Sequence, residues 1–396
     1  MVPDGWKEAQ LGEFMSFKNG VNASKDAYGS GTKFVNVMDV FGTDRLSERQ
    51  IIGEMVVTDK QLQDYSVLYG DVLFNRTSET QHEIALTTVY VDEEPVVFGG
   101  FVIRGRQTEE RLLPEFSIYA FQSESIRREM IRRGQGAVRA NIGQKDLIKV
   151  PMLIPPKVEQ RKLAEILTNM DQVIEITKCL ISNSERQKTA LMQQLLTGKK
   201  RLKGFSEEWD SYKLSKLEKL DWIELGRGKI ISKIDIANNP GPYPIYSSSI
   251  KNRGIFGYYG DFLFDEELIS WSVDGGGHFF HRAKHRFSVT NVSGWLRIKT
   301  QKLNYGFLAH QLQMLHSQIH FDYQSKAHPS VIRELYTIKV PPIEEQMAIA
   351  LVLKSCSETI LGYQQNLANL NQEKAALVQQ LLTGKRRVKI DGEIAA

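Results

Sequence analysis

The stretch Pro-Pro-Lys-Val-Glu-Gln at residues 155–160 decides the fold of this chain, because it recurs as Pro-Pro-Ile-Glu-Glu-Gln at residues 341–346. It opens a segment, residues 155–203, that aligns without a gap onto residues 341–389. Near their ends both copies carry the same seven residues, Gln-Gln-Leu-Leu-Thr-Gly-Lys. The resulting period of 186 residues is far too long for a solenoid of small repeats. The chain is therefore predicted to be a tandem duplication of whole domains.

A weaker repeat lies upstream of each copy. Trp6-Lys-Glu-Ala-Gln-Leu11 resembles Trp209-Asp-Ser-Tyr-Lys-Leu214, with Trp and Leu at the same spacing. Each unit thus consists of a variable globular part followed by a closely repeated segment. We expect two globular parts, two repeated segments and a short tail, with the boundaries 1–154, 155–203, 204–340, 341–390 and 391–396.

The repeated segment has the sequence pattern of a long helix. Between the paired prolines and the Thr-Gly there is no proline in either copy, and Gly362 is the only glycine. The prolines suit helix starts, and Gly198 and Gly384 suit left-handed C-terminal caps. Apolar residues recur at alternating spacings of three and four, which is typical of a coiled-coil seam. The predicted seam consists of Leu163, Leu167, Met170, Ile174, Ile181, Leu191, Leu195, Ile349, Leu353, Cys356, Ile360, Leu367, Leu370, Leu377 and Leu381.

A helix from Lys157 to Thr197 would be roughly 60 Å long at about 1.5 Å per residue. One such helix cannot bury its narrow apolar seam alone, so we expect the two copies to pack on each other. If the two units are related by an approximate two-fold axis, the helices run antiparallel and carry the globular parts at opposite ends. The alternative is two ordinary core helices, but those average about 11–12 residues.

The globular parts show mixed strand and helix patterns. Strand-like runs occur at Lys33–Met38, Thr87–Val91, Val96–Phe98, Phe101–Ile103, Phe262–Phe264, Leu268–Trp271 and Phe287–Val289. Helical patterns occupy Ser123–Arg133 and Tyr305–His320. The predicted fold class is α+β: two tandem mixed α/β domains joined by two long antiparallel coiled-coil helices in a pseudo-two-fold duplication.

Composition agrees with a folded multi-domain protein of the cytoplasm. The 396 residues are 41% hydrophobic and 25% charged, with a net charge of +4. There is no apolar run long enough for a membrane span, and the start lacks the pattern of a signal peptide. Two cysteines are too few for a disulfide framework, which suits a reducing compartment. The mild positive charge permits a nucleic-acid partner without requiring one.

The search for catalytic or metal-binding motifs gives only weak candidates. Gly226-Arg-Gly-Lys229 lacks the spacing of a phosphate loop. Asn238-Asn-Pro-Gly-Pro-Tyr243 superficially resembles the Asn-Pro-Pro-Tyr of adenine methyltransferases, but the inserted glycine breaks the run and no glycine-rich cofactor loop precedes it. His278, His281 and His285 lack a thiolate or a tightly placed carboxylate set, so a basic surface with interleaved aromatic residues is favoured over a metal site. We expect no catalytic residue, metal or cofactor in this chain.

Basic residues accumulate in irregular stretches of both globular parts. Arg and Lys bind phosphates, and Arg also reads base edges. Clusters in corresponding parts of a duplicated chain favour a nucleic-acid surface, although a salt-bridged solvated face remains the alternative for each residue. The basic runs at residues 199–201 and 385–387 suit helix capping as well as DNA contact. The predicted DNA-binding residues are Arg76, Arg127, Arg128, Arg132, Arg133, Arg139, Lys145, Lys251, Arg253, His278, His281, Arg282, Lys284, His285 and Lys326.

Over essentially its whole length, the sequence resembles the DNA specificity (S, HsdS) subunits of type I restriction-modification systems. The most specific elements are the P-P-x-x-E-Q openings at Pro155 and Pro341 and the Q-Q-L-L-T-G-K closings. The Gly70-Asp71-Val-Leu-Phe74 stretch and the starts at Trp6 and Trp209 are also typical.

The resemblance implies a non-catalytic subunit whose globular parts are target recognition domains, each reading half of a split site in double-stranded DNA. It implies that the helices set the gap between the halves and dock two methyltransferase (M) subunits, with restriction (R) subunits added. S-adenosylmethionine, ATP and Mg are then expected on the partner subunits. Two alternatives remain open: a non-enzymatic coiled-coil scaffold, and a self-contained methyltransferase that would itself bind S-adenosylmethionine.

Overall fold

The structure is a computed structural model that describes residues 2–22, 24–136, 139–249, 251–273, 278–319 and 326–389. The chain divides into two compact units. The first consists of Met1–Ile176 with Leu367–Ala396, and the second of Thr177–Asn366. Each unit therefore contains one globular domain and part of both long helices. Within the described ranges, no helix has the length and apolar character needed to cross a membrane.

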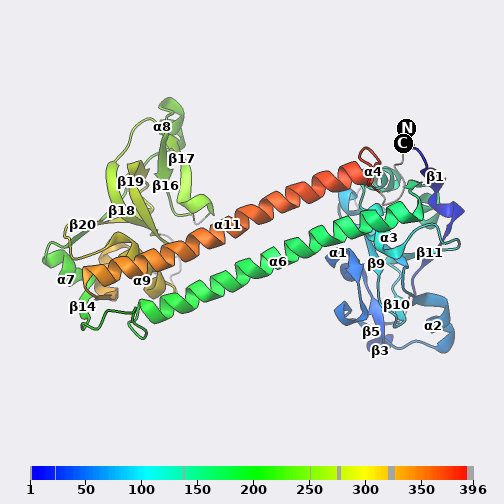
Figure 1. Ribbon diagram of the computed structural model, residues 1–396, viewed down its shortest axis with the longest axis horizontal. Helices are drawn as coiled ribbons and strands as arrows, with labels where there is room; N and C mark the ends of the chain where they lie inside the picture. The colour runs from blue at the N-terminus through cyan, green and yellow to red at the C-terminus, as the bar shows by residue number, and fades with distance from the viewer. Residues whose placement is uncertain are drawn as a thin grey trace. The chain divides into compact units, whose positions relative to one another are not determined.

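Two helices of 39 residues each, α6 (Lys157–Leu195) and α11 (Ile343–Leu381), fulfil the helix prediction (Figure 1). Each ends before a glycine in the left-handed region, Gly198 at φ 73° and Gly384 at φ 67°. The amide of each glycine donates to the last helical residue, and the amide two residues later reaches back six positions. This is the hydrogen-bonding pattern of a glycine C-cap. Every residue of the predicted seam is buried or partly buried.

The two helices meet in the antiparallel sense within each unit. In the first unit, Leu163 and Leu167 near the start of α6 share a buried cluster with Leu381 at the end of α11. In the second unit, Leu195 at the end of α6 shares a cluster with Leu353 near the start of α11. The start of one helix thus packs with the end of the other in both units.

The first unit is built on two sheets. The larger has the order β2-β11-β7-β9-β4 and the smaller the order β5-β3-β10-β6. The strands of the larger sheet are Met15–Asn19 (β2), Val102–Gln107 (β11), Val72–Asn75 (β7), Thr87–Tyr90 (β9) and Arg45–Leu46 (β4). Those of the smaller are Glu54–Met55 (β5), Tyr28–Val35 (β3), Val96–Phe98 (β10) and Ser66–Val67 (β6). Two further pairs are β1 (Lys7–Gln10) with β13 (Pro151–Ile154) and β8 (Thr77–Ser78) with β12 (Ala140–Asn141). The shorter helices are Val37–Gly42 (α1), Asp59–Tyr65 (α2), Pro114–Ala120 (α3), Glu124–Arg133 (α4) and Gln144–Leu147 (α5).

The second unit is built on one six-stranded sheet of order β15-β20-β18-β19-β16-β17. Its strands are Ile223–Arg227 (β15), Ser293–Ile298 (β20), Phe264–Ser272 (β18), Phe279–Val289 (β19), Tyr243–Tyr246 (β16) and Ile255–Tyr259 (β17). The pair β14 (Asp210–Lys213) with β21 (Thr337–Val340) closes the domain as β1 with β13 closes the first. The helices are Leu214–Lys219 (α7), Lys233–Asn238 (α8), Tyr305–His316 (α9) and Pro329–Leu335 (α10).

Both globular domains share one scaffold. The order β2-β11-β7-β9 in the first matches β15-β20-β18-β19 in the second. Equivalent backbone hydrogen bonds fix the register: the amide of Val102 donates to Gly99 at 2.9 Å, and that of Ser293 donates to Thr290 at 3.0 Å. The duplication therefore extends to the domains whose sequences resemble each other only weakly.

Three sequence expectations were wrong in detail. The strand expected at Lys33–Met38 ends at Val35, because Asn36 caps helix α1 by accepting a hydrogen bond from the amide of Met38 at 2.7 Å. The basic run at residues 278–286, expected to be irregular, lies almost wholly in β19. The helix expected to reach His320 ends at His316, and His320 lies outside the described residues.

Candidate nucleic-acid interface

The repeated Pro-Pro-x-x-Glu-Gln motif forms a buried joint in each unit. In the first unit the carboxylate of Glu159 accepts hydrogen bonds from Trp6 Nε1 and from two guanidinium nitrogens of Arg387, all at 2.9 Å. In the second, Glu345 accepts from Trp209 Nε1 at 2.9 Å and from Arg201 twice at 2.6 Å. Both carboxylates are at most 1% exposed. The sequence left Arg201 and Arg387 open between helix capping and DNA contact; the structure pairs them with these carboxylates.

The glutamine of the motif ties each long helix to the domain before it. The Gln160 amide accepts from the Leu113 amide at 2.8 Å and donates to the Arg111 carbonyl at 2.9 Å. Gln346 makes the same pair of contacts with Asn304 and Lys302, each at 2.9 Å. Sequence reasoning missed these roles, although the exact repetition of Glu-Gln was the signal for them. The joint therefore fixes each long helix to the globular domain that precedes it.

Two loops of the first domain bring candidate DNA-binding residues together. Strand β8 pairs with β12, and the amide of Ile142 donates to the carbonyl of Arg76 at 3.0 Å. Arg139 lies just before β12 and Lys145 just after it on α5, and both side chains are exposed. Arg76 is partly buried, with Nη1 donating to the Gly100 carbonyl at 3.3 Å. This loop pair is the strongest candidate for DNA contact in the first domain.

Arg127, predicted to bind DNA, has an internal role. Its guanidinium donates to the backbone carbonyls of His82 at 2.9 Å and Ile84 at 2.8 Å, and also to Ala85. Burial lowers its pKa to about 10, so the side chain remains charged at neutral pH. Because its donors are used on the turn that follows β8, Arg127 is corrected from a DNA contact to a residue that positions this turn.

The other three arginines of α4 differ in exposure. Arg128 pairs with Glu124, and Arg132 pairs with Glu129 at 2.7 Å, yet both side chains are well exposed. Arg133 donates to the Lys149 carbonyl at 2.9 Å and is largely covered. Exposed ion pairs contribute little to stability, so Arg128 and Arg132 can exchange their carboxylates for phosphates at small cost.

The equivalent loops of the second domain begin at matching positions. The amide of Ala327 donates to the carbonyl of Val273 at 3.0 Å, as Ile142 does to Arg76. Lys326 is exposed and precedes Ala327, while His278 is partly buried at the start of β19. Residues 274–277 and 320–325 of these loops lie outside the described residues.

The predicted basic cluster on β19 is divided by the strand. Arg282 is 3% exposed, so its side chain lies beneath the exposed members of the cluster and can meet DNA only through the opening of a pocket. His281 pairs with Glu267 at 2.5 Å, and His285 contacts the Tyr246 hydroxyl at 3.0 Å. The exposed members are Lys284 on β19 and Lys251 and Arg253 on the neighbouring turn. No group of three His, Cys, Asp or Glu side chains suited to a metal occurs in the described ranges.

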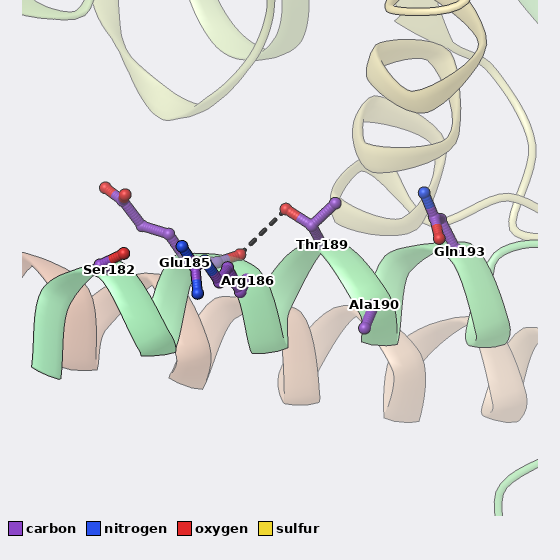
Figure 2. A pocket seen from close by; sticks show the side chains of 6 residues that line it. All are labelled: Ser182, Glu185, Arg186, Thr189, Ala190 and Gln193. Carbon is purple, nitrogen blue, oxygen red and sulfur yellow. Dashed lines mark hydrogen bonds between the residues drawn. The ribbon is translucent and has the colours of Figure 1, made fainter. Parts of the chain in front are cut away.

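A shallow groove of about 440 Å³ follows one face of α6 in the second unit (Figure 2). It is lined by Ser182, Glu185, Arg186, Thr189, Ala190 and Gln193. The only hydrogen bond drawn among them joins the Thr189 hydroxyl to the Glu185 carbonyl at 2.9 Å, which is internal to the helix. The six side chains are exposed and follow the helical spacing of one face of α6.

The sequence matches the family described as type I restriction modification DNA specificity domain over residues 3–184 and 206–372. The chain therefore belongs to this family, and it is a non-catalytic specificity subunit of the type I restriction-modification class.

Individual relatives agree with the family match. The chain is 23% identical to the putative type I restriction enzyme MjaX specificity subunit of Methanocaldococcus jannaschii, over 98% of this chain and 95% of that protein. It is 33% identical to the type I restriction enzyme MpnII specificity subunit of Mycoplasma pneumoniae, over 36% of this chain and 44% of that protein. In fold it is similar to the crystal structure of a type I restriction-modification S subunit from M. genitalium, with a TM-score of 0.60 and 14% identity over 98% of this chain and 100% of that one.

Proposed function

We propose that the two globular domains, residues 1–154 and 204–340, each read one half of a bipartite site in double-stranded DNA. The observation that carries this proposal is the shared sheet order and register of two domains whose loop residues differ. Arg76 in the first domain occupies the position of Val273 in the second, as their equivalent carbonyl contacts indicate. One scaffold with two sets of surface side chains is what recognition of two different half-sites requires.

The long helices are proposed to set the gap between the half-sites and to dock two methyltransferase subunits, which restriction subunits then join. Large apolar side chains that remain exposed on the helices support a docking role. In the first unit these are Val158, Val173 and Ile176 of α6, and in the second unit Leu180 of α6 with Met347, Leu351 and Leu361 of α11. An exposed apolar patch on a folded protein commonly marks a contact with another protein.

The cofactors of the complex are proposed to reside on the partner subunits, in the cytoplasm. The methyltransferase subunits would supply S-adenosylmethionine, and the restriction subunits ATP and Mg. This chain would contribute affinity through phosphate contacts and specificity through base contacts.

The proposed function is tested by co-expressing the chain with its methyltransferase subunits and mapping modified adenines across the host genome. The expected result is a split motif with a fixed gap, absent when the methyltransferase subunits are expressed alone. A continuous motif would contradict the two-domain reading. Modification without any motif would favour the alternative of a DNA-independent scaffold.

A further inference from the structure

The register of the two sheets makes Tyr90 of the first domain equivalent to Arg282 of the second. In the first domain Phe74 of β7 pairs with Thr87 of β9, and Tyr90 lies three residues after Thr87. In the second domain Trp271 of β18 pairs with Phe279 of β19, and Arg282 lies three residues after Phe279. Tyr90 is fully buried in an apolar cluster. The duplicated scaffold thus places a guanidinium where its other copy has a core tyrosine.

The segment that packs beside each of these two positions also differs between the domains. In the first domain Val35 and Val40 pack in the cluster with Tyr90, and Val40 belongs to helix α1, which follows β3 almost directly. Tyr246 is equivalent to Val35, because each ends a strand that pairs in parallel with the sheet. The described residues after Tyr246 form no such helix, only a 3-10 turn, Lys251–Gly254.

A pocket of about 260 Å³ opens in the second domain at this place. Its lining is mainly basic and aromatic: Tyr246, Arg253, Ile255, His281, Arg282, Ala283 and His285. Gly254, at φ 82°, lies next to Arg282, and a Cβ there would lie 3.2 Å from Arg282 Nη2. The turn therefore approaches the guanidinium closely at a residue that has no side chain.

Among the residues that the structure describes, the charge of Arg282 has no counter-ion. Its Nε donates to Ser270 Oγ at 2.9 Å, and its guanidinium carbon lies 3.6 Å from the ring centre of Tyr246. Within the described part of the chain no carboxylate pairs with it, and Glu266 and Glu267 on β18 pair with other residues. A buried cation without a counter-ion is unfavourable, so an anion bound in the pocket would offset a charge that the described residues leave unbalanced.

The pocket wall is held in place by His285. Its Nδ1 lies 2.6 Å from the Ala283 carbonyl, which can only accept, so Nδ1 carries the proton and donates. The Nε2 atom of the same ring lies 3.0 Å from the Tyr246 hydroxyl, so the ring joins the β19 backbone to the tyrosine. A bulge in the pairing of β18 with β19 leaves Ala283 and Lys284 exposed beside this wall.

We propose that this pocket binds a phosphate oxyanion through Arg282, with Arg253 at its rim, and that the oxyanion is a backbone phosphodiester of the half-site read by the second domain. The planar guanidinium group matches the geometry of two phosphate oxygens. A guanidinium shielded from water binds such an anion more strongly than an exposed one. The assignment to DNA rests on the proposed function; the oxyanion pocket itself does not.

The pocket is tested first with inorganic phosphate and the full-length chain. Phosphate should raise the melting temperature above that in chloride of equal ionic strength, by an amount that grows with phosphate concentration, since it binds only the folded state. Arg282→Met should abolish this rise, yet melt no lower than the natural protein without phosphate, because it removes an unpaired buried charge. Arg286→Met, on the same strand but paired with exposed Asp265, should keep the rise.

Arg253→Ala changes an exposed residue and provides a second variant if Arg282→Met does not fold; it should weaken the phosphate effect. The second arm measures duplex-DNA affinity of the complex with methyltransferase subunits against salt. In Arg282→Met, the loss of one phosphate contact should make the slope of log K against log salt shallower than in the natural chain by about 0.9.

A phosphate effect together with a lower slope supports the full proposal. A phosphate effect with an unchanged slope supports the pocket but overturns its assignment to DNA, leaving a small free anion as occupant. No phosphate effect, or one that Arg282→Met retains, overturns the pocket. These outcomes are independent of the methylation motif, so failure of the pocket and failure of the proposed function can be told apart.

Discussion

Single side chains hold each long helix to its domain through a buried carboxylate. Removing Arg201 would leave the Glu345 charge, which is fully buried, with the Trp209 indole as its one side-chain partner among the described residues. We expect Arg201→Ala to lower the free energy of unfolding by about 3–5 kcal/mol, measured by urea denaturation. Arg128→Ala, which breaks an exposed pair, should cost about 0–1 kcal/mol. Equal losses for the two variants would show that the joint is not what stabilises the second unit.

A partly buried histidine, His310, makes stability depend on pH. Burial is the main cause that lowers the pKa of His310 on α9 to about 4, with the nearby charges of Lys188, His281 and His278 adding to it. The ordinary pKa is 6.5, so between about pH 4 and 6.5 the unfolded chain binds more protons than the folded chain. The folded-state advantage is therefore present above pH 6.5 and is lost as the pH falls towards 4.

His310→Gln should flatten this dependence, as seen in urea midpoints at pH 5 and pH 7.5. His82→Gln, at an exposed position, is the matched control and should leave the dependence unchanged. An unaltered pH dependence in the His310 variant would contradict the assignment.

At the residue scale the sequence predicted types of side chain better than their roles. The repetition of Trp and of Glu-Gln marked residues of importance, but their arginine partners lie 144 and 228 positions away along the chain. Arg127 and Arg139 are alike as sequence, and only tertiary packing directs one guanidinium inward and leaves the other exposed. The burial of Arg282 depends on the register of a strand that the sequence pattern did not reveal.

The turn at residues 82–85 illustrates how one element depends on another. Arg127 of α4 donates to three of its carbonyls, and the turn follows β8 in the proposed reading surface. Arg127→Met should remove these charged hydrogen bonds, each worth about 1.5–3 kcal/mol, and loosen the turn. In methylation mapping, we expect the first half of the motif to become degenerate while the second half is unchanged.

Arg128 lies on the same helix, and its guanidinium pairs with exposed Glu124 instead of the turn, so Arg128→Met should leave the first half-site intact. Equal degeneracy of both halves in the Arg127 variant would indicate general instability instead of a local effect on reading.

Among elements, the helices were the most predictable and the domain strands the least. A seam sustained over some forty residues leaves few structural alternatives, and the observed helix ends at Leu195 where the sequence suggested Thr197. Short strands depend on single residues, as the Asn36 cap that ends β3 shows. Strand β16 and the edge strand β17 were missed, because their apolar runs are too short to carry a period.

In the whole molecule the duplication allocates different tasks to its parts. The two domains keep one sheet register but exchange a core tyrosine for an arginine, so the scaffold is retained while its chemistry changes. The joints at Glu159 and Glu345 repeat with the same partners, which fits segments that must do the same work in both units. Sequence similarity is therefore high in the helices and joints and low in the proposed reading surfaces.

Reading and spacing are proposed to be separate tasks of the domains and the helices, and one measurement tests that separation most directly. Four residues, about one helical turn or roughly 6 Å, are inserted after Ser182 in α6 and after the equivalent Ala368 in α11. Modified adenines are then mapped for the altered and natural chains, each co-expressed with the methyltransferase subunits. The predicted result is a changed gap between two unchanged half-sites. Altered half-sites with an unchanged gap would contradict the proposal.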